Sequence, residues 1–182
     1  MSRIKTVTSD TATPVQKELL DAIESKLGIV PNFLRALAHS PDALTAFLGL
    51  YGISENGSLP ALTRERIALV VAQQNSCDYC LSVHSAIAKK AGLSDTEIQA
   101  NRSGSSEDEE AAAAVTFANA LNTHLGDITQ AEFDAVRAAG YTDSDIVEII
   151  THVGMNILTN LIGKATRIDI DFPKVAVSDI AA

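Results

Sequence analysis

The chain has 182 residues, a formal net charge of -9 and a hydrophobic share of 46%, with only 4% aromatic residues. Such an acidic balance argues against nucleic-acid binding, which needs a basic surface to displace counterions, and against docking on anionic membranes. The length suits one domain that is stable without disulfides or a structural metal, and a core poor in aromatic residues favours close helix packing.

The N-terminal residues lack the apolar segment of a signal peptide, and no apolar run reaches the roughly 18 residues of a membrane span. We therefore expect a cytoplasmic protein with no membrane or nucleic-acid partner. Both cysteines, Cys77 and Cys80, lie within four positions of each other. In a reducing compartment such a pair is more often catalytic or metal-binding than a structural disulfide.

An N-terminal arm of residues 1–12 precedes the first predicted helix, which begins at Thr13 and Pro14 and ends at Gly28. Threonine is a favourable N-cap, proline suits the first helical position, and glycine is the usual residue after the last turn. These signals predict a helix with sharply defined ends.

A short helical piece and then a helix opened by Ser40 and Pro41 are predicted next. After a loop, Thr63 is expected to cap a helix that runs to about Asn75. That helix is apolar nearly all round, so we expect it to be buried, either centrally or against a partner subunit.

The following helix carries both cysteines and is expected to end at Gly92. Ser76 is its predicted N-cap, which would place Cys77 at the first helical position. Ser94 and Glu97 then have the spacing of a capping box and predict the start of another helix.

A polar, acidic, Ser/Gly-rich segment at residues 101–110 is expected to be an exposed loop. It divides one domain into two helical halves, residues 13–100 and residues 111–166. The remainder, residues 167–182, is predicted to be an extended C-terminal tail.

The second half begins with an Ala-rich helix that is expected to end near His124. Thr129 and Glu132 form a second predicted capping box, and the final long helix starts at Thr142 or Asp143. Residues 139–146 repeat the character of residues 91–98, which reflects either shared capping residues or a duplicated helical hairpin. The pattern as a whole predicts an all-α bundle of stacked helical hairpins.

The chemistry of the chain is concentrated in one C-x-x-C motif, Cys77 and Cys80, which is followed by His84. On an α-helix this spacing brings the two thiols within disulfide reach and places the imidazole one turn after the second thiol. A neighbouring base and a helix N-terminus are the conditions that lower a thiol pKa into the reactive range.

Other kinds of site fit the motif less well. A c-type haem site requires His directly after the second cysteine, where this chain has Leu81. A zinc site formed by Cys77, Cys80 and His84 lacks an obvious fourth ligand close by. Two inert buried cysteines remain an alternative, and Glu65 alone is an ordinary acidic residue in a first helical turn. A reactive dithiol is therefore the favoured interpretation.

Together, Glu65, Cys77, Cys80 and His84 stand at spacings that resemble the signature of the alkylhydroperoxidase D-like group of the carboxymuconolactone decarboxylase superfamily. The resemblance extends over residues 14–173, and the surrounding segments also resemble the peroxidase-related branch. The segments that carry it are 28–33, 40–41, 63–66 and 80–92.

The resemblance implies an AhpD-like all-helical fold assembled into a homo-oligomer, often a trimer or hexamer, and peroxide reduction or disulfide exchange without metal, flavin or haem. Carried over by position, Cys80 is the peroxide-attacking thiol, Cys77 the resolving thiol, and His84 with Glu65 the proton relay. A thioredoxin-like or lipoyl-type protein, or another external dithiol, would reduce the pair. Some members have a second His directly before the second cysteine, where this chain has Tyr79, a poor base near neutral pH.

The assignment of the attacking thiol weighs two effects. The helix dipole favours Cys77, but it contributes about 1 kcal/mol or less at exposed sites, whereas a hydrogen-bonded base beside Cys80 is worth more. Two other functions remain open. One is redox sensing or disulfide exchange without peroxidase turnover. The other is a carboxymuconolactone decarboxylase-type lyase, whose chemistry has no need of a dithiol.

The remaining histidines are interpreted as structural. His39 and His124 lie near helix C-termini, where a cation is favourable, and His152 on an apolar helix is expected to satisfy a hydrogen bond in the core or in a subunit contact. Asn156 and Asn160, one turn apart, are consistent either with capping a neighbouring backbone or with lining the site.

Overall fold

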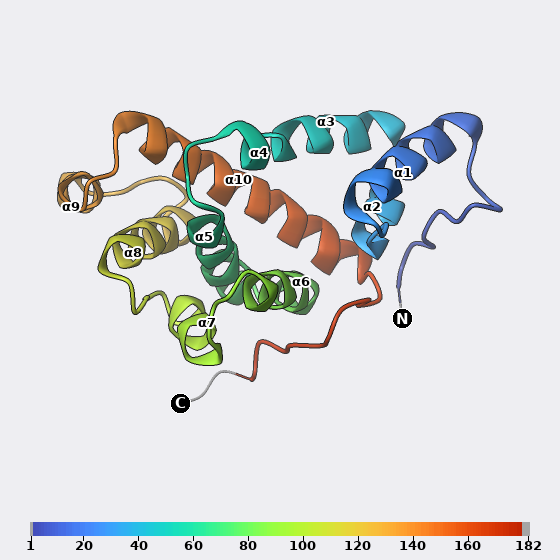
Figure 1. The fold of residues 1–182 in the computed structure, drawn as a ribbon. Helices are drawn as coiled ribbons and strands as arrows, with labels where there is room; N and C mark the ends of the chain where they lie inside the picture. The colour runs from blue at the N-terminus through green and yellow to red at the C-terminus, as the bar shows by residue number, and fades with distance from the viewer. Residues whose placement is uncertain (1, 180–182) are drawn as a thin grey trace.

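Residues 2–179 are described by the computed structural model, and their regular structure is entirely helical (Figure 1). The helices in chain order are α1 (Pro14–Leu27), α2 (Asn32–Leu37), α3 (Pro41–Tyr51), α4 (Ile53–Asn56), α5 (Ala61–Gln74), α6 (Asp78–Lys90), α7 (Asp95–Arg102), α8 (Glu109–Thr123), α9 (Gln130–Ala138) and α10 (Asp143–Thr166). No strand occurs in this part of the chain, so the expected all-α class is confirmed. The single turn α4 was not predicted.

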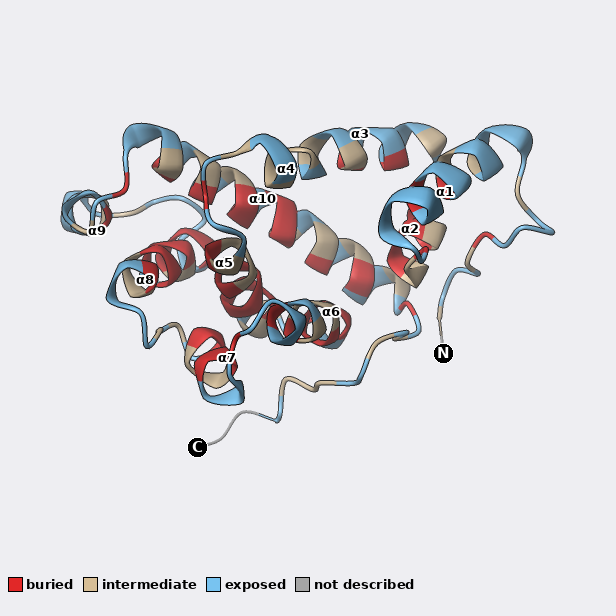
Figure 2. Cartoon of the chain, viewed as in Figure 1, coloured by how far each residue is buried: buried red, intermediate tan, exposed pale blue. Residues whose placement is uncertain are grey.

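Helix α5 lies at the centre of the fold and packs against α6, α7, α8 and α10. Its residues 66–72 are all buried, as the colouring of Figure 2 shows. Val70 and Val71 belong to one apolar cluster shared with α8 and α10, whereas Leu69 and Ala72 belong to a second cluster shared with α6 and the N-terminal helices. The predicted burial of this helix is confirmed, and its central position explains its lack of a polar face.

Helix α10, with 24 residues, is the longest described helix and packs against α5, α6 and α8. Its length and its mean hydropathy of 1.4 meet the requirements of a membrane span, contrary to the expectation that no segment would. The buried side of the helix also carries His152, Asn156 and Asn160. In this fold α10 therefore acts as a core helix with polar groups directed inward.

Several predicted helix ends are confirmed by their hydrogen bonds. Thr13, Thr129 and Thr142 each cap a helix and complete a capping box with the residue three positions later. Ser40 caps α3, and Gly28 ends α1 in the left-handed conformation at φ 75°. These signals depend only on neighbouring residues, and for that reason the sequence reveals them.

One predicted cap and one predicted capping box differ in the structure. Thr63 lies inside α5, whose N-cap is Pro60 and which has no side-chain cap. Ser94 caps α7 as predicted, but the Glu97 side chain does not complete a capping box. It turns inward instead and accepts a hydrogen bond from Arg66 of α5 at 2.7 Å. A buried ionic partner replaces the local backbone partner.

The polar loop between the two helical halves is shorter than the predicted range 101–110. Asn101 and Arg102 belong to α7 and are buried, and α8 begins at Glu109. The Arg102 guanidinium donates to the Gln73 side chain at 2.9 Å and to carbonyl groups of the C-terminal tail. Arg102, which the sequence assigned to a loop, therefore joins α7 to α5 and to the tail.

After α10 the chain has no helix or strand up to residue 179 and runs along α6 and α7 (Figure 1). The backbone N–H of Val175 donates to Ser82 at 2.9 Å, and the N–H of Val177 donates to the Asp78 carboxylate at 2.9 Å. The tail also places the Phe172 ring 6.4 Å from the Tyr79 ring, centroid to centroid. The tail therefore forms part of the surroundings of the cysteine helix.

Candidate functional site

The site begins at the tight link between α5 and α6. Ser76 follows the end of α5 in the left-handed conformation, at φ 54°. Its N–H donates to the Gln73 carbonyl at 3.1 Å, and the N–H of Cys77 donates to the Ala72 carbonyl at 3.0 Å. This pair of bonds is the Schellman motif, which closes a helix C-terminus with one left-handed residue.

Cys77 completes that motif and at the same time is the N-cap of α6. Its Sγ accepts the N–H of Cys80 at 3.3 Å, as an N-cap side chain does. The prediction that Ser76 is the N-cap is therefore wrong, because Ser76 already serves as the last residue of the α5 terminus. The first cysteine precedes the first helical position by one residue.

Cys77 and Cys80 form a disulfide with their Cα atoms 5.3 Å apart. The two residues are buried, with 1% and 3% of their surfaces exposed, but their surroundings differ. Cys80 lines a cavity, whereas Cys77 faces α10 at Gly163. A Cβ at Gly163 would stand 3.3 Å from the Cys77 Sγ and 3.8 Å from the Cys80 Sγ. This glycine lets α10 pack directly against the sulfurs.

His84 lies one turn after Cys80 on α6, and Glu65 lies on the adjacent α5. The His84 Nδ1 and the Glu65 Oε2 are 2.8 Å apart, and both side chains are about one-fifth exposed. The contact engages Nδ1 and leaves Nε2, the other ring nitrogen, unused by Glu65, and His84 lines the cavity. The four predicted site residues are thus brought together by two packed helices.

Tyr79 does not act as a second base in this arrangement. Its hydroxyl donates to Asp171 at 3.0 Å and accepts the backbone N–H of Phe33 at 3.1 Å. Burial, and then the charge of Asp171, raise the pKa of Tyr79 well above its ordinary value. The phenol therefore stays protonated and links α6, the start of α2 and the C-terminal tail.

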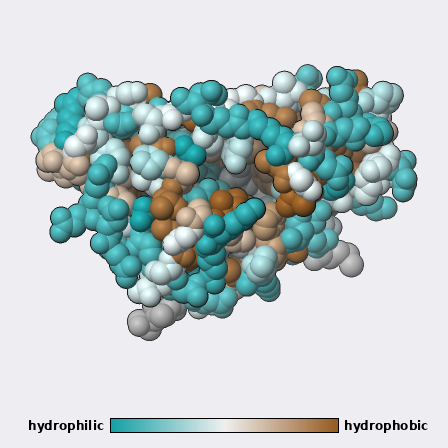
Figure 3. All heavy atoms as spheres, viewed as in Figure 1, coloured by the Kyte–Doolittle hydropathy of each residue, from teal (hydrophilic) through white to brown (hydrophobic). Residues whose placement is uncertain are grey.

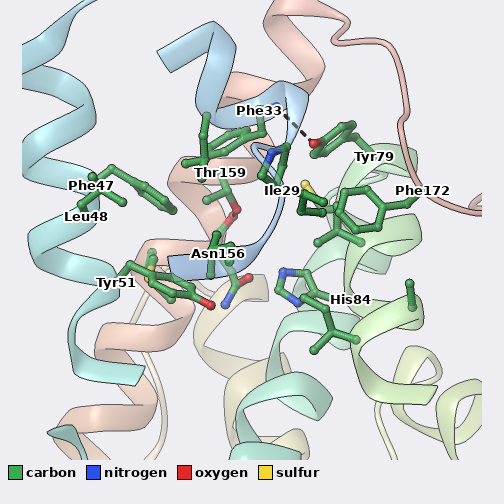
Figure 4. A pocket seen from close by; sticks show the side chains of 18 of the residues that line it. Ile29, Phe33, Phe47, Leu48, Tyr51, Tyr79, His84, Asn156, Thr159 and Phe172 are labelled. Atoms are coloured by element: carbon green, nitrogen blue, oxygen red, sulfur yellow. Dashed lines mark hydrogen bonds between the residues drawn. The ribbon is translucent and has the colours of Figure 1, made fainter. Parts of the chain in front are cut away.

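The cavity is a groove of about 430 Å³ that runs beside α6. Figure 3 shows apolar surface gathered in the hollow on this face of the molecule, and Figure 4 shows the aromatic side chains around it. Its walls come from α1, α2, α3, α6, α10 and the tail. The apolar residues that line it are Leu27, Ile29, Pro31, Phe33, Leu34, Phe47, Leu48, Val83, Ala86, Ile87, Met155 and Phe172.

A small polar region lies in the same groove. Asn156 and Thr159 of α10, together with Tyr51 of α3, line it alongside His84 (Figure 4). The Asn156 Nδ2 donates to the His152 carbonyl at 2.8 Å, which fixes the amide on the helix. Sequence reasoning left the role of Asn156 open and missed Tyr51 and Thr159, because only the fold brings α3 and α10 opposite α6.

The other singled-out residues lie outside the groove. His39 bonds the Lys5 carbonyl at 2.6 Å, and His124 is the C-cap of α8, as the structural interpretation predicted. Asn160 accepts from the Asn75 side chain at 3.0 Å. His152 is buried, within the described residues its Nε2 has no partner, and burial lowers its pKa.

Residues 41–123 match the sequence model of the carboxymuconolactone decarboxylase family, and all four predicted site residues lie in that segment. No curated protein matches the chain. A peroxidase-related protein of Silicibacter sp. TM1040 is 26% identical, with 92% of this chain and 91% of that chain covered and a TM-score of 0.81.

Two further solved structures share the fold. A peroxidase-related protein of Ralstonia eutropha JMP134, described as an alkylhydroperoxidase AhpD core, is 24% identical over 93% of this chain and 92% of that chain, with a TM-score of 0.80. A variant of the debrominase Bmp8 in complex with 2,3,4-tribromopyrrole is 22% identical over 94% of both chains, with a TM-score of 0.77. Residues 41–123 therefore resemble the carboxymuconolactone decarboxylase family, and the chain has the all-helical AhpD-like fold.

Proposed function

We propose that this protein is a thiol peroxidase that reduces organic hydroperoxides with Cys80 and Cys77, assisted by His84 and Glu65. The observation that carries the proposal is the unequal placement of the two sulfurs. Cys80 lines the groove together with His84, whereas Cys77 is buried against α10. A substrate in the groove meets only one of the two thiols.

In the reduced protein, His84 accepts the proton of the Cys80 thiol while Glu65 holds the ring at Nδ1. The Cys80 thiolate attacks the terminal oxygen of the hydroperoxide, and the O–O bond breaks. The departing alkoxide takes the proton from His84 and leaves as an alcohol. Cys80 is left as a sulfenic acid.

The Cys77 thiol then attacks the Cys80 sulfur, the S–S bond forms, and the sulfenic oxygen leaves as water. One hydroperoxide and two thiols have become one alcohol, one water and one disulfide. The disulfide of the structure corresponds to this oxidised product. An external dithiol, which we expect to be a thioredoxin-like or lipoyl-type protein of the cytoplasm, reduces it by thiol–disulfide exchange.

The main alternative is a disulfide-exchange protein that uses the same two cysteines without reducing peroxide. Rapid mixing of the reduced protein with cumene hydroperoxide, with peroxide loss followed in time, separates the two functions. We expect one equivalent of peroxide to be consumed per chain, much faster than by free glutathione. The Cys80→Ser variant is expected to lose this reaction. Consumption no faster than by glutathione would contradict the proposal.

We also propose that the chain self-associates through the outer face of α10. The exposed apolar members of this face are Val147, Ile150, Leu158 and Leu161. Glu148 is the one charged residue between Val147 and Leu161, and its carboxylate is directed away from this face to the backbone N–H groups of Ser58 and Leu59. In a chain with net charge -9, such a face is best accounted for by a second copy that covers it. The residues opposite on this helix, including Asn156 and Gly163, belong to the site, so the interface would support the site from outside.

A further inference from the structure

Among the described residues that line the groove, Lys90 is the one lysine or arginine, and it lies three turns after Tyr79 on α6. Along α6 the groove is lined by Cys80, His84, Ile87 and Lys90, which recur at helical spacing on one face. Lys90 is exposed, and within the described residues it takes part in no ion pair or hydrogen bond. Its neighbour Lys89 does not line the groove and instead pairs with Asp95 at 2.6 Å.

The charged side chains that line the groove are of one sign. No aspartate or glutamate is among the residues that line it, although the chain as a whole is strongly acidic. The exposed rim of the groove is apolar, because Leu27, Ile29 and Ile87 each line the groove while remaining substantially exposed, and Ile87 lies one turn before Lys90 on α6. An apolar channel with one unpaired ammonium group at its mouth is complementary to an apolar molecule that ends in an anion.

The length of the groove adds a further constraint. Cys80 and Lys90 are ten positions apart on one straight helix, so they are separated by about 15 Å along its axis. A small peroxide that fills the reactive end would leave the apolar walls and Lys90 without contacts. A long-chain carboxylic acid spans this distance with its chain against the apolar walls.

We infer that the groove takes hydroperoxides of long-chain carboxylic acids, with the peroxide group at Cys80 and the carboxylate at Lys90. This substrate class rests on the proposed peroxide reduction at Cys80. The cysteines, His84 and Glu65 carry out the same proton and electron transfers as with any other hydroperoxide. Lys90 contributes only to binding of the carboxylate. The alcohol that leaves is the corresponding hydroxy acid.

Binding can be measured without turnover. Titration calorimetry of the oxidised protein uses laurate and dodecanol, both below their aggregation limits. The two ligands have the same twelve-carbon chain, and only laurate carries a negative charge. We expect laurate to bind about fivefold more tightly, as one ion pair at an exposed mouth provides, and Lys90→Gln to abolish the difference. Lys89→Gln, the matched control, is expected to retain it. Equal binding of laurate and dodecanol by the wild type would overturn the assignment. So would an equal loss of the preference for laurate in Lys90→Gln and Lys89→Gln.

Turnover supplies the second test. Linoleic acid hydroperoxide is expected to have about fivefold higher kcat/KM than its methyl ester in the wild type, chiefly through KM, and nearly equal kcat/KM in Lys90→Gln. If no hydroperoxide is reduced while laurate still binds through Lys90, the peroxidase proposal fails and the carboxylate site stands. If both hydroperoxides are reduced equally well by the wild type, the carboxylate site fails and the peroxidase proposal stands.

Discussion

The Glu65 carboxylate and the His84 imidazole, on two neighbouring helices, meet at 2.8 Å through Nδ1. A carboxylate at Nδ1 fixes the orientation and the tautomer of a catalytic imidazole and leaves Nε2 for the reacting group. The helix packing of α5 against α6, and not the local sequence, creates this pair.

We predict that Glu65→Gln and His84→Gln each lower the rate of hydroperoxide reduction by about a hundredfold, because each interrupts one proton relay. Since the two residues act as a unit, the double variant is expected to be no slower than the slower single variant. The measurement is single-turnover peroxide loss by the reduced protein. Glu24→Gln, an exposed change on α1, serves as the control, and additive losses in the double variant would contradict a shared relay.

Gly163 offers a test of the packing behind the sulfurs. We predict that Gly163→Ala slows disulfide closure, because its Cβ would stand 3.3 Å from the Cys77 Sγ, closer than ordinary van der Waals contact. The measurement is the lifetime of the sulfenic acid after one equivalent of peroxide. Gly49→Ala, a helical glycine of α3 with no atom within 4 Å of the added Cβ, is the matched control. Equal lifetimes in the two variants would show that α10 does not constrain Cys77.

The left-handed backbone conformation of Ser76 is expected to make the stability of the protein depend on the residue at this position. A β-branched residue is strained in the left-handed conformation that Ser76 adopts, whereas glycine is not. We predict that Ser76→Val lowers the free energy of unfolding of the reduced protein by about 1 kcal/mol or more, and that Ser76→Gly leaves it unchanged or raises it. Urea denaturation measures both. Equal stability of the two variants would argue against the left-handed link.

Glu97 is predicted to make the stability depend on pH in the acid range. Burial by itself raises its pKa, but hydrogen bonds from Ser106, the Glu107 backbone, Asn101 and Arg66 outweigh burial and lower the pKa from 4.5 to about 2. A lowered pKa means that the ionised form is favoured in the folded state. Its contribution, about 3 kcal/mol, is therefore complete above about pH 4.5 and lost as the pH falls toward about 2.

The measurement is urea denaturation of the wild type and Glu97→Gln at about pH 7 and about pH 3. The difference in unfolding free energy between the two proteins is expected to shrink at the lower pH. Glu18→Gln, an exposed change on α1, controls for the general effect of charge. A difference that stays constant with pH would mean that Glu97 does not titrate as described.

The outer face of α10 is tested by a charge. We predict that the wild type is an oligomer by light scattering and that Leu161→Glu, at a side chain 63% exposed, shifts it toward the monomer. Val15→Glu places the same charge at a residue of α1 that is 56% exposed, and it is expected to leave the mass unchanged. A monomeric wild type would contradict the proposed interface.

Local signals in the sequence predicted the all-α class and most helix ends. Thr13, Ser40 and Thr142 have their hydrogen-bond partners within three residues, so the sequence contains the whole interaction. Glu97 and Ser76 were misassigned for the opposite reason. Their decisive contacts are a buried arginine of another helix and the terminus of the preceding helix, which the local pattern does not contain.

The site was predictable only where its members share a helix or a recognised spacing. Cys77, Cys80 and His84 lie on or next to α6, and the family resemblance supplied Glu65. Tyr51, Thr159 and Phe172 come from three other segments, so they became visible only when the fold placed them around one groove. Gly163 gave no sequence signal, because its importance lies in the side chain that it lacks.

The most direct measurement of the division of labour between the thiols is mass spectrometry of single-cysteine variants treated with a hydroperoxide in the presence of dimedone. Cys77→Ser is expected to carry a dimedone adduct at Cys80, formed from its trapped sulfenic acid. Cys80→Ser is expected to carry none, because Cys77 is buried behind the groove. An adduct at Cys77 in Cys80→Ser, with none at Cys80 in Cys77→Ser, would contradict the account.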